Sequence, residues 1–210
     1  MVRIKICGVT TPEDACLAAE LGAHAIGLNF FPESPRSISP FTARNIIREL
    51  PPFVASVGIF VNWAPEPVIA LSQALRLAAA QLHGEETPQT VAEVAKKLPV
   101  IKALRIEKGG APVGLPRHRA ATAFLLDAVS PGLLGGTGLT TDWGQARTLA
   151  LSHRVILAGG LTPDNIAEAI LTVRPFAVDV SSGVESLPGK KDPLKLRAFF
   201  CEVARAAGRL

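Results

Sequence analysis

Cysteine and histidine are scarce in this sequence of 210 residues, and their placement excludes several classes of site. Three cysteines are too few and too scattered for a disulfide framework, and their spacing matches no zinc pattern. The histidines show no ligand spacing either, so we expect no metal and no cofactor. The scattered residues are Cys7, Cys16, Cys201, His24, His118 and His153. A reduced, cytoplasmic enzyme or binding protein is the expectation.

Long apolar runs and one-sign charge clusters are also missing. No run approaches the roughly 18 consecutive apolar residues of a membrane span, and residues 1–6 lack the apolar region of a signal peptide. The 22 basic and 18 acidic residues give a net charge of +4 without forming a basic stripe. We therefore expect neither membrane nor nucleic acid as a partner, whereas a small anionic substrate fits the mildly basic balance.

Short apolar runs rich in β-formers alternate with amphipathic segments from end to end. Several runs are apolar at consecutive positions, which is typical of parallel strands buried on both faces. The predicted strands are Val2–Cys7, Ala25–Phe30, Val54–Val61, Ala78–Leu82, Val100–Leu104, Ala123–Leu126, Val155–Ala158 and Ala177–Val180.

Helix start signals lie between these runs. A capping Ser, Thr or Asp precedes a proline at Thr11, Ser39, Thr87, Thr162 and Asp192. Residues 109–119 hold three glycines and two prolines, so we expect that connection to be short, irregular or only partly helical. Lys190-Lys191 and Arg117-His118-Arg119 are predicted to be solvated turns, and Phe41 and Trp143 are predicted to lie in the core.

About eight strand–helix units predict an α/β fold, a (β/α)₈ TIM barrel with an irregular or short fifth helix. No composition shift marks a boundary, so residues 1–210 are predicted to form a single domain. An open doubly wound sheet is the alternative, but it would need a topological switch point. The regular repetition favours closure. The sequence leaves the assembly open between a monomer and a homodimer.

Polar residues close several of the predicted strands. Cys7, Asn29, His83 and Asp127 follow or end apolar runs, and Asp179 lies within the last one. Because barrel active sites lie at the carboxyl ends of the strands, we expect these side chains to converge on one rim. Convergence is a prediction of the fold and not of their spacing.

Glycine-rich turns follow the last two predicted strands. Loops at these positions often hold phosphate through backbone N–H groups, glycine allows close approach, and serine adds donors. A third loop, residues 135–138, could fold over a ligand. The candidate phosphate-binding residues are Gly136, Gly159, Gly160, Ser181, Ser182 and Gly183.

Read together, these motifs resemble phosphoribosylanthranilate isomerase, the tryptophan-pathway enzyme that rearranges N-(5-phosphoribosyl)anthranilate to the 1-deoxyribulose isomer. The resemblance covers nearly the whole chain, and it departs at Thr141, where the family usually has an aromatic residue. The ordered set that carries it is Lys5-Ile6-Cys7-Gly8, Ser34-Pro35-Arg36, residues 57–62, Gln81-Leu82-His83-Gly84, Leu125-Leu126-Asp127, residues 135–138 and residues 178–185.

The resemblance implies an Amadori rearrangement and a role for each matching residue. Asp127 matches the general acid that protonates the ring oxygen, and Cys7 matches the base that removes the adjacent C–H proton. A nearby cation or helix N-terminus is expected to lower the thiol pKa. Arg36 matches a partner for the anthranilate carboxylate, and His83 and Asp179 match positions near the substrate.

Other interpretations of the same residues stay open. By position alone, Cys7 and His83 are typical of structural residues, Arg36 of a solvated loop, and Asp127 of a cap or ion-pair partner. A rival enzyme is another phosphate-binding barrel, such as indole-glycerol-phosphate synthase or a pentose-phosphate epimerase. Lys5 and Lys102 lie on or near strands, but neither occupies a matching synthase motif. A non-catalytic barrel that binds a phosphosugar is the alternative from a different class.

Overall fold

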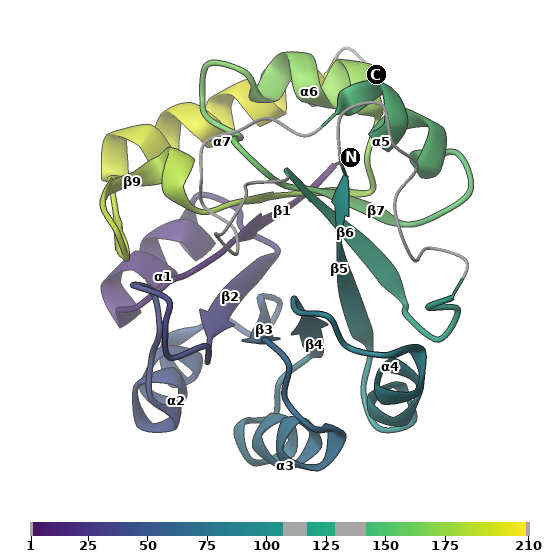
Figure 1. Cartoon of the computed structure of the whole chain (residues 1–210). Helices are drawn as coiled ribbons and strands as arrows, with labels where there is room; N and C mark the ends of the chain where they lie inside the picture. The colour runs from purple at the N-terminus through teal and green to yellow at the C-terminus, as the bar shows by residue number, and fades with distance from the viewer. Residues whose placement is uncertain (1, 107–116, 129–141, 209–210) are drawn as a thin grey trace.

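Eight parallel strands close into a barrel in the computed structural model, which describes residues 2–106, 117–128 and 142–208. Each strand pairs with the next one in chain order, and the eighth pairs with the first. Figure 1 shows the strands in the middle with the helices around them. The strands are β1 (Arg3–Ile6), β2 (Ala25–Asn29), β3 (Ala55–Phe60), β4 (Ala79–Leu82), β5 (Val100–Ile106), β6 (Ala123–Ala128), β7 (Val155–Leu157) and β8 (Ala177–Val180).

The helices begin largely where the cap-and-proline signals predict them. The side chains of Thr11, Ser39, Thr87 and Asp192 accept hydrogen bonds from first-turn N–H groups, which are otherwise unpaired at a helix start. The helices are α1 (Pro12–Glu20), α2 (Pro40–Glu49), α3 (Pro65–Leu75), α4 (Pro88–Ala95), α5 (Trp143–Ala150), α6 (Ile166–Val173) and α7 (Pro193–Ala207).

The predicted closed barrel and its eight strand runs are confirmed, with two qualifications along the chain. The helix expected to open at Thr162 begins only at Ile166, because the side chain of Asn165 bonds back to Thr162 N and Gly160 O and holds a turn there. Most of the connection predicted to be short or irregular after the fifth strand, residues 107–116, lies outside the described residues.

Apolar side chains form two buried layers, as the strand pattern predicts. One layer lies between the strands and the helices and includes Ile26, Leu126 and Phe199. The other fills the barrel with mostly small or branched side chains, among them Ala79 and Leu125. The filled interior makes the barrel a rigid support for residues at its rim.

A short hairpin follows the last barrel strand and is important for the site. The one-turn 3₁₀ helix η1 (Ser182–Val184) leads into β9 (Glu185–Leu187), which pairs with β10 (Lys190–Lys191) before α7 begins. Figure 1 places β9 beside α7 at the edge of the barrel. The hairpin brings Glu185 and Lys191 back toward the first strand.

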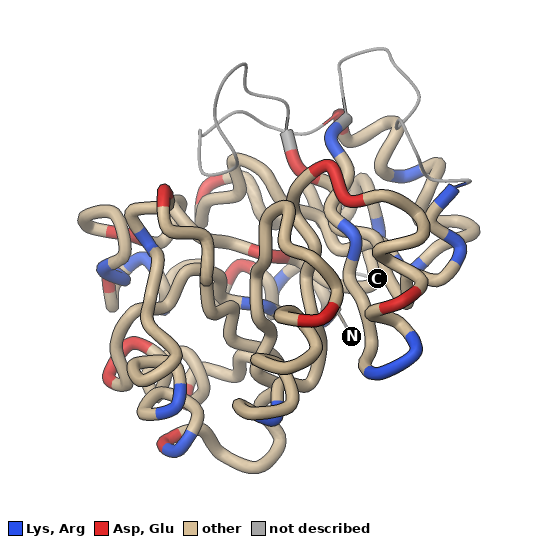
Figure 2. The backbone as a smooth tube through the Cα atoms, turned by 60° about the horizontal axis from the view of Figure 1, so that its bottom comes forward, with Lys and Arg blue, Asp and Glu red and all other residues tan. Residues whose placement is uncertain are grey.

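Charged residues are mixed along the described backbone. Figure 2 shows Lys and Arg interspersed with Asp and Glu over the elements it colours. None of the helices in the described ranges is both long enough and apolar enough to cross a membrane.

Candidate active site

One cavity at the rim of the barrel gathers almost every residue that the sequence predicts for the site. About 780 Å³ of space not filled by atoms lies in this cavity, open solvent at its mouth included. Gly136 lies outside the described residues. The predicted residues that line the cavity are Cys7, Arg36, His83, Asp127, Gly159, Gly160, Asp179, Ser181, Ser182 and Gly183.

Cys7 lies directly after β1 and is only partly exposed. Its backbone N–H donates to the carbonyl of Val180 at 2.8 Å, and its own carbonyl accepts from Lys191 Nζ at 2.6 Å. Burial raises the pKa of the Cys7 thiol, and the carboxylate of Asp179 raises it further. The ammonium groups of Lys5 and Lys191 act in the opposite direction.

The expected lowering of the Cys7 pKa is therefore wrong in its net direction. Neighbouring cations are present as predicted, but burial destabilises the thiolate more than those cations stabilise it, so the pKa of Cys7 rises. The thiol form of Cys7 is favoured, and the two lysines moderate that preference.

Asp179 forms a buried ion pair with Lys5. The Lys5 Nζ lies 2.9 Å from Asp179 Oδ1, and the two residues are register partners on β1 and β8. Burial tends to lower the pKa of Lys5, but Asp179 and Cys7 outweigh it and raise that pKa. The pair gives the buried carboxylate the partner that it requires, and it puts a cation beside Cys7.

His83 connects Asp127 to the floor of the cavity. Its Nε2 lies 3.4 Å from Asp127 Oδ2, and its Nδ1 lies 2.8 Å from the amide Nε2 of Gln81. Because an amide nitrogen only donates, Nδ1 accepts and the ring proton of a neutral His83 is on Nε2, facing the carboxyl group. His83 thus orients Asp127 at the end of β6.

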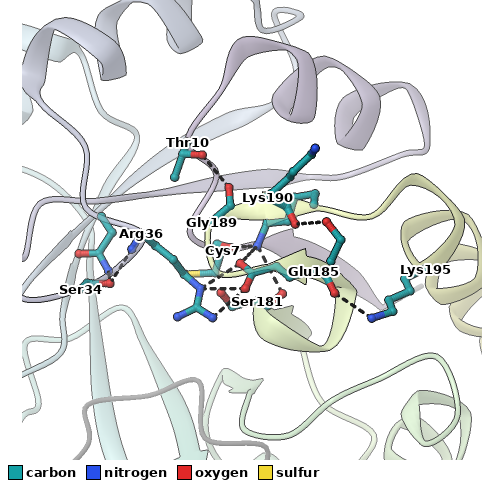
Figure 3. Close-up of polar contacts among 12 residues, drawn as sticks. Cys7, Thr10, Ser34, Arg36, Ser181, Glu185, Gly189, Lys190 and Lys195 are labelled. Atoms are coloured by element: carbon teal, nitrogen blue, oxygen red, sulfur yellow. Dashed lines mark hydrogen bonds and ion pairs between the residues drawn. The ribbon is translucent and has the colours of Figure 1, made fainter.

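Arg36 meets a carboxylate that belongs to the protein itself. Its Nε lies 2.9 Å from Glu185 Oε1 and its Nη2 lies 2.7 Å from Glu185 Oε2, a two-point contact. Lys191 Nζ lies 2.8 Å from Glu185 Oε1. In Figure 3 the side chains of Arg36, Cys7, Ser181 and Glu185 point toward one another. The hydrogen bonds that Arg36 donates to Glu185 raise the pKa of Arg36.

The prediction that Lys190-Lys191 is a solvated turn is wrong for Lys191. Lys190 is exposed, but Lys191 is only 2% exposed and its ammonium donates to the carbonyls of Cys7 and Ser181. The antiparallel pairing of β10 with β9 turns consecutive side chains to opposite sides, so one lysine faces water and the other faces the protein.

The two predicted glycine turns lie at the same end of the cavity. Gly159 and Gly160 have φ angles of 82° and 62°, a conformation that side chains rarely adopt. A Cβ atom at Gly183 would lie 1.8 Å from the carbonyl oxygen of Leu161, so only glycine lets the turns approach this closely. The hydroxyl of Ser181 is buried without a hydrogen-bond partner in the described structure. Such an environment suits an anion bound by donors.

Sequence reasoning assigned no role to Glu185, Lys191 or Gln81. Glu185 ends one of the quoted motifs, but nothing in its neighbourhood indicates a partner 149 positions away. Within the described ranges, no cluster of three or more His, Cys, Asp or Glu side chains could hold a metal ion.

Comparison with known proteins places the chain in a family. The family model described as N-(5'phosphoribosyl)anthranilate (PRA) isomerase matches residues 4–202. The N-(5'-phosphoribosyl)anthranilate isomerase of Trichlorobacter lovleyi is 52% identical over 201 residues, which cover 95% of this chain and 97% of that protein.

Solved structures agree with this match. The phosphoribosyl anthranilate isomerase of Thermus thermophilus superposes with a TM-score of 0.88 at 45% identity, covering 97% of this chain and 99% of that one. A phosphoribosyl anthranilate isomerase in complex with reduced 1-(o-carboxyphenylamino)-1-deoxyribulose 5-phosphate gives a TM-score of 0.84 at 40% identity, covering 98% and 100%. The chain belongs to the N-(5'-phosphoribosyl)anthranilate isomerase family.

Proposed function

We propose that this chain converts N-(5'-phosphoribosyl)anthranilate into 1-(2-carboxyphenylamino)-1-deoxyribulose 5-phosphate, with Asp127 as general acid and Cys7 as general base. The observation that supports these roles best is that a thiol following β1 and a carboxyl group on β6 line one cavity together with two glycine turns. The family match supports the reaction, a step of tryptophan biosynthesis.

Ring opening comes first and needs an acid. Protonation of the furanose oxygen by Asp127 lets the C1–O bond break as the anthranilate nitrogen supplies its lone pair, giving an iminium ion. The burial of the Asp127 carboxyl group, with His83 Nε2 3.4 Å from its Oδ2, supports such a transfer. The proton leaves Asp127 and ends on the C4 hydroxyl of the open sugar.

Proton abstraction follows. The iminium acidifies the C2–H bond, Cys7 as thiolate accepts that proton, and the electron pair forms an enol-amine that tautomerises to the ketone. A thiolate in a poorly hydrated site is a strong base, and Lys5 and Lys191 stabilise its charge. Atoms balance without any added reagent, since the product is an isomer of the substrate.

Each part of the substrate is assigned to a group of residues in the cavity. We assign the anthranilate carboxylate to Arg36 and the sugar to His83 and Asp179. The 5′-phosphate goes to the turns of Gly159, Gly160, Ser181, Ser182 and Gly183. The positive φ angles of Gly159 and Gly160 and the unpartnered Ser181 hydroxyl support the phosphate assignment.

We also propose a domain organisation, an assembly state and a cellular compartment for the enzyme. Residues 1–210 act as one catalytic domain, as a monomer or a homodimer. All three cysteines are free thiols, which supports a reducing cytoplasm. Light scattering of the purified protein reports the assembly directly.

The direct test is the loss of anthranilate-type fluorescence from freshly generated phosphoribosylanthranilate. The protein is expected to accelerate it, and Asp127→Asn is expected to fail at ring opening. Asp164→Asn, at an exposed loop position, is the matched control. A folded protein that gives no acceleration would contradict the isomerase, leaving a phosphosugar-binding barrel. Full activity of Asp127→Asn would reassign the acid.

A further inference from the structure

Three charged side chains outside the catalytic pair form one buried group. The Arg36–Glu185–Lys191 cluster combines two cations with one carboxylate, and the side chains are 13%, 4% and 0% exposed. All three side chains come from loops or the β9–β10 hairpin and not from the barrel strands. A buried group with this much charge needs a function or a strong structural reason.

Glu185 occupies only one side of the Arg36 guanidinium. It accepts from Nε and Nη2, so the end formed by Nη1 and the second Nη2 hydrogen stays open. In the part of the chain that the structure describes, no residue accepts a hydrogen bond from Nη1, and Arg36 lines the cavity. The guanidinium can therefore bind a second carboxylate while Glu185 keeps it fixed.

Charge balance requires a third group if that second carboxylate is to bind well. Arg36 and Glu185 alone are neutral together, and Glu185 would repel an incoming carboxylate at close range. Lys191 restores one positive charge. Its ammonium is surrounded by three acceptors, the carbonyls of Cys7 and Ser181 and the Glu185 carboxylate, so all three N–H bonds of the charged form are used.

We propose that Lys191 is a specificity-determining residue, whose ammonium neutralises Glu185 so that Arg36 offers a net positive charge to the carboxylate of the substrate. Glu185 is the positioning residue that orients the guanidinium. The proposal rests on the assignment of Arg36 to the anthranilate carboxylate under the proposed function, and it adds the two residues that make that assignment electrostatically workable.

The same ammonium joins the parts of the site. Lys191 ties the backbone of Cys7 at the end of β1 to that of Ser181 after β8, and Glu185 links both to Arg36. The side chain of Arg36 also crosses Gly8, where a Cβ atom would lie 2.4 Å from Arg36 Cδ. The carboxylate-binding group is thus fixed relative to the base and the phosphate turn.

The experiment compares two ligands that differ only in the carboxylate. One is reduced 1-(o-carboxyphenylamino)-1-deoxyribulose 5-phosphate, and the other is its phenylamino counterpart without the carboxyl group. Calorimetric Kd values give the carboxylate preference of each variant. Lys191→Met is expected to reduce that preference about 10-fold, as for one charge-assisted interaction. Lys190→Met, the same change at the exposed neighbour, is expected to leave it unaltered.

A double variant distinguishes an electrostatic role of Lys191 from a purely structural one. Lys191→Met with Glu185→Gln returns the cluster to a net charge of +1, so the preference is expected to recover relative to Lys191→Met. A merely structural cluster would instead bind both ligands more weakly to the same degree, and the double variant would be worse than the single. Either of those results would overturn the proposal.

Two further outcomes are decisive. If Lys191→Met does not fold, the double variant alone decides, because it leaves no unpaired carboxylate; absence of a carboxylate preference in it would reject the proposal. Arg36→Met checks the underlying assignment. If Arg36→Met keeps the full carboxylate preference, Arg36 does not bind the carboxylate. If Arg36→Met loses the preference but Lys191→Met keeps it, only the role of Lys191 is rejected.

Discussion

The ammonium of Lys5 lies 2.9 Å from the carboxylate of Asp179, across the seam where β1 meets β8. Lys5 stands two residues before Cys7, so the two side chains leave β1 on the same side. The ammonium stabilises the Cys7 thiolate, and the carboxylate of Asp179 opposes it. The proposed base therefore depends on Lys5, a residue that exchanges no proton with the substrate in the proposed reaction.

Lys5→Met is therefore expected to shift the pH dependence of the reaction. Removal of the cation raises the Cys7 pKa still further, so kcat/KM reaches its half-maximal value at a higher pH. At fixed neutral pH, kcat/KM falls about tenfold for each unit of that shift. A kcat/KM profile against pH measures the change, with the exposed Lys97→Met as control. An unmoved profile at reduced kcat would show that Lys5 acts only through packing.

Cys7→Ser tests the base itself. A hydroxyl is a far weaker base than a thiolate, so kcat is expected to fall by roughly 10² to 10⁴, while the affinity for the reduced product analogue changes little. Stopped-flow fluorescence and calorimetry measure the two quantities. Cys201→Ser, at an exposed position on α7, should behave as the parent protein. A nearly active Cys7→Ser would remove Cys7 as the base.

Gly183→Ala tests the contact between the two glycine turns. The added methyl group would lie 1.8 Å from the Leu161 carbonyl oxygen, so the turns must separate. We expect weaker binding of inorganic phosphate and of the reduced product analogue, together with a lower Tm. Gly208→Ala, where the nearest atom is 3.7 Å away, is the matched control. Unchanged phosphate affinity would place the phosphate elsewhere.

The pKa of Glu86 predicts how the free energy of unfolding changes at acidic pH. Burial tends to raise its pKa, but Lys102 at 2.8 Å and the backbone N–H of Asn62 outweigh this and lower it. The stabilisation is therefore complete above the unfolded pKa of about 4.3, and it is lost as pH falls through the lower folded value.

Glu86→Gln leaves Lys102 buried without its counter-charge, so the free energy of unfolding at neutral pH is expected to drop by about 3–5 kcal/mol. The difference from the parent should shrink as the solution is acidified. Urea titrations at several pH values check this, with Glu85→Gln as control because that side chain is 81% exposed. An equal stability of Glu86→Gln and the parent at pH 7 would contradict the prediction.

Much of the fold could be predicted because its signals are local. Consecutive apolar residues mark the strands, a cap followed by proline marks most helix starts, and strand order fixes the rim on which Cys7 and Asp127 meet. The helix caps at Thr11 and Asp192 follow from the chemistry of unpaired N–H groups. Each of these inferences uses only neighbours in the chain.

The remaining features depend on tertiary packing. Phe41 was predicted to lie in the core but is 70% exposed, because α2 turns Ala43 and Ile46 inward instead. His118, predicted in a solvated turn, is buried. The contact of Arg36 with Glu185 spans 149 positions, and no pattern of apolar residues encodes it. The Thr137 region of the predicted glycine loop lies outside the described residues.

The hydrogen bond from Lys191 to the carbonyl of Cys7 joins residues 184 positions apart. Lys191, which bonds to the backbone just after the first strand, is therefore synthesised only in about the last tenth of the polypeptide. Until then the newly made chain lacks the hairpin whose lysine bonds to the backbone of both Cys7 and Ser181. The proposed active site is therefore completed late in synthesis, and chains terminated before the hairpin are expected to be inactive.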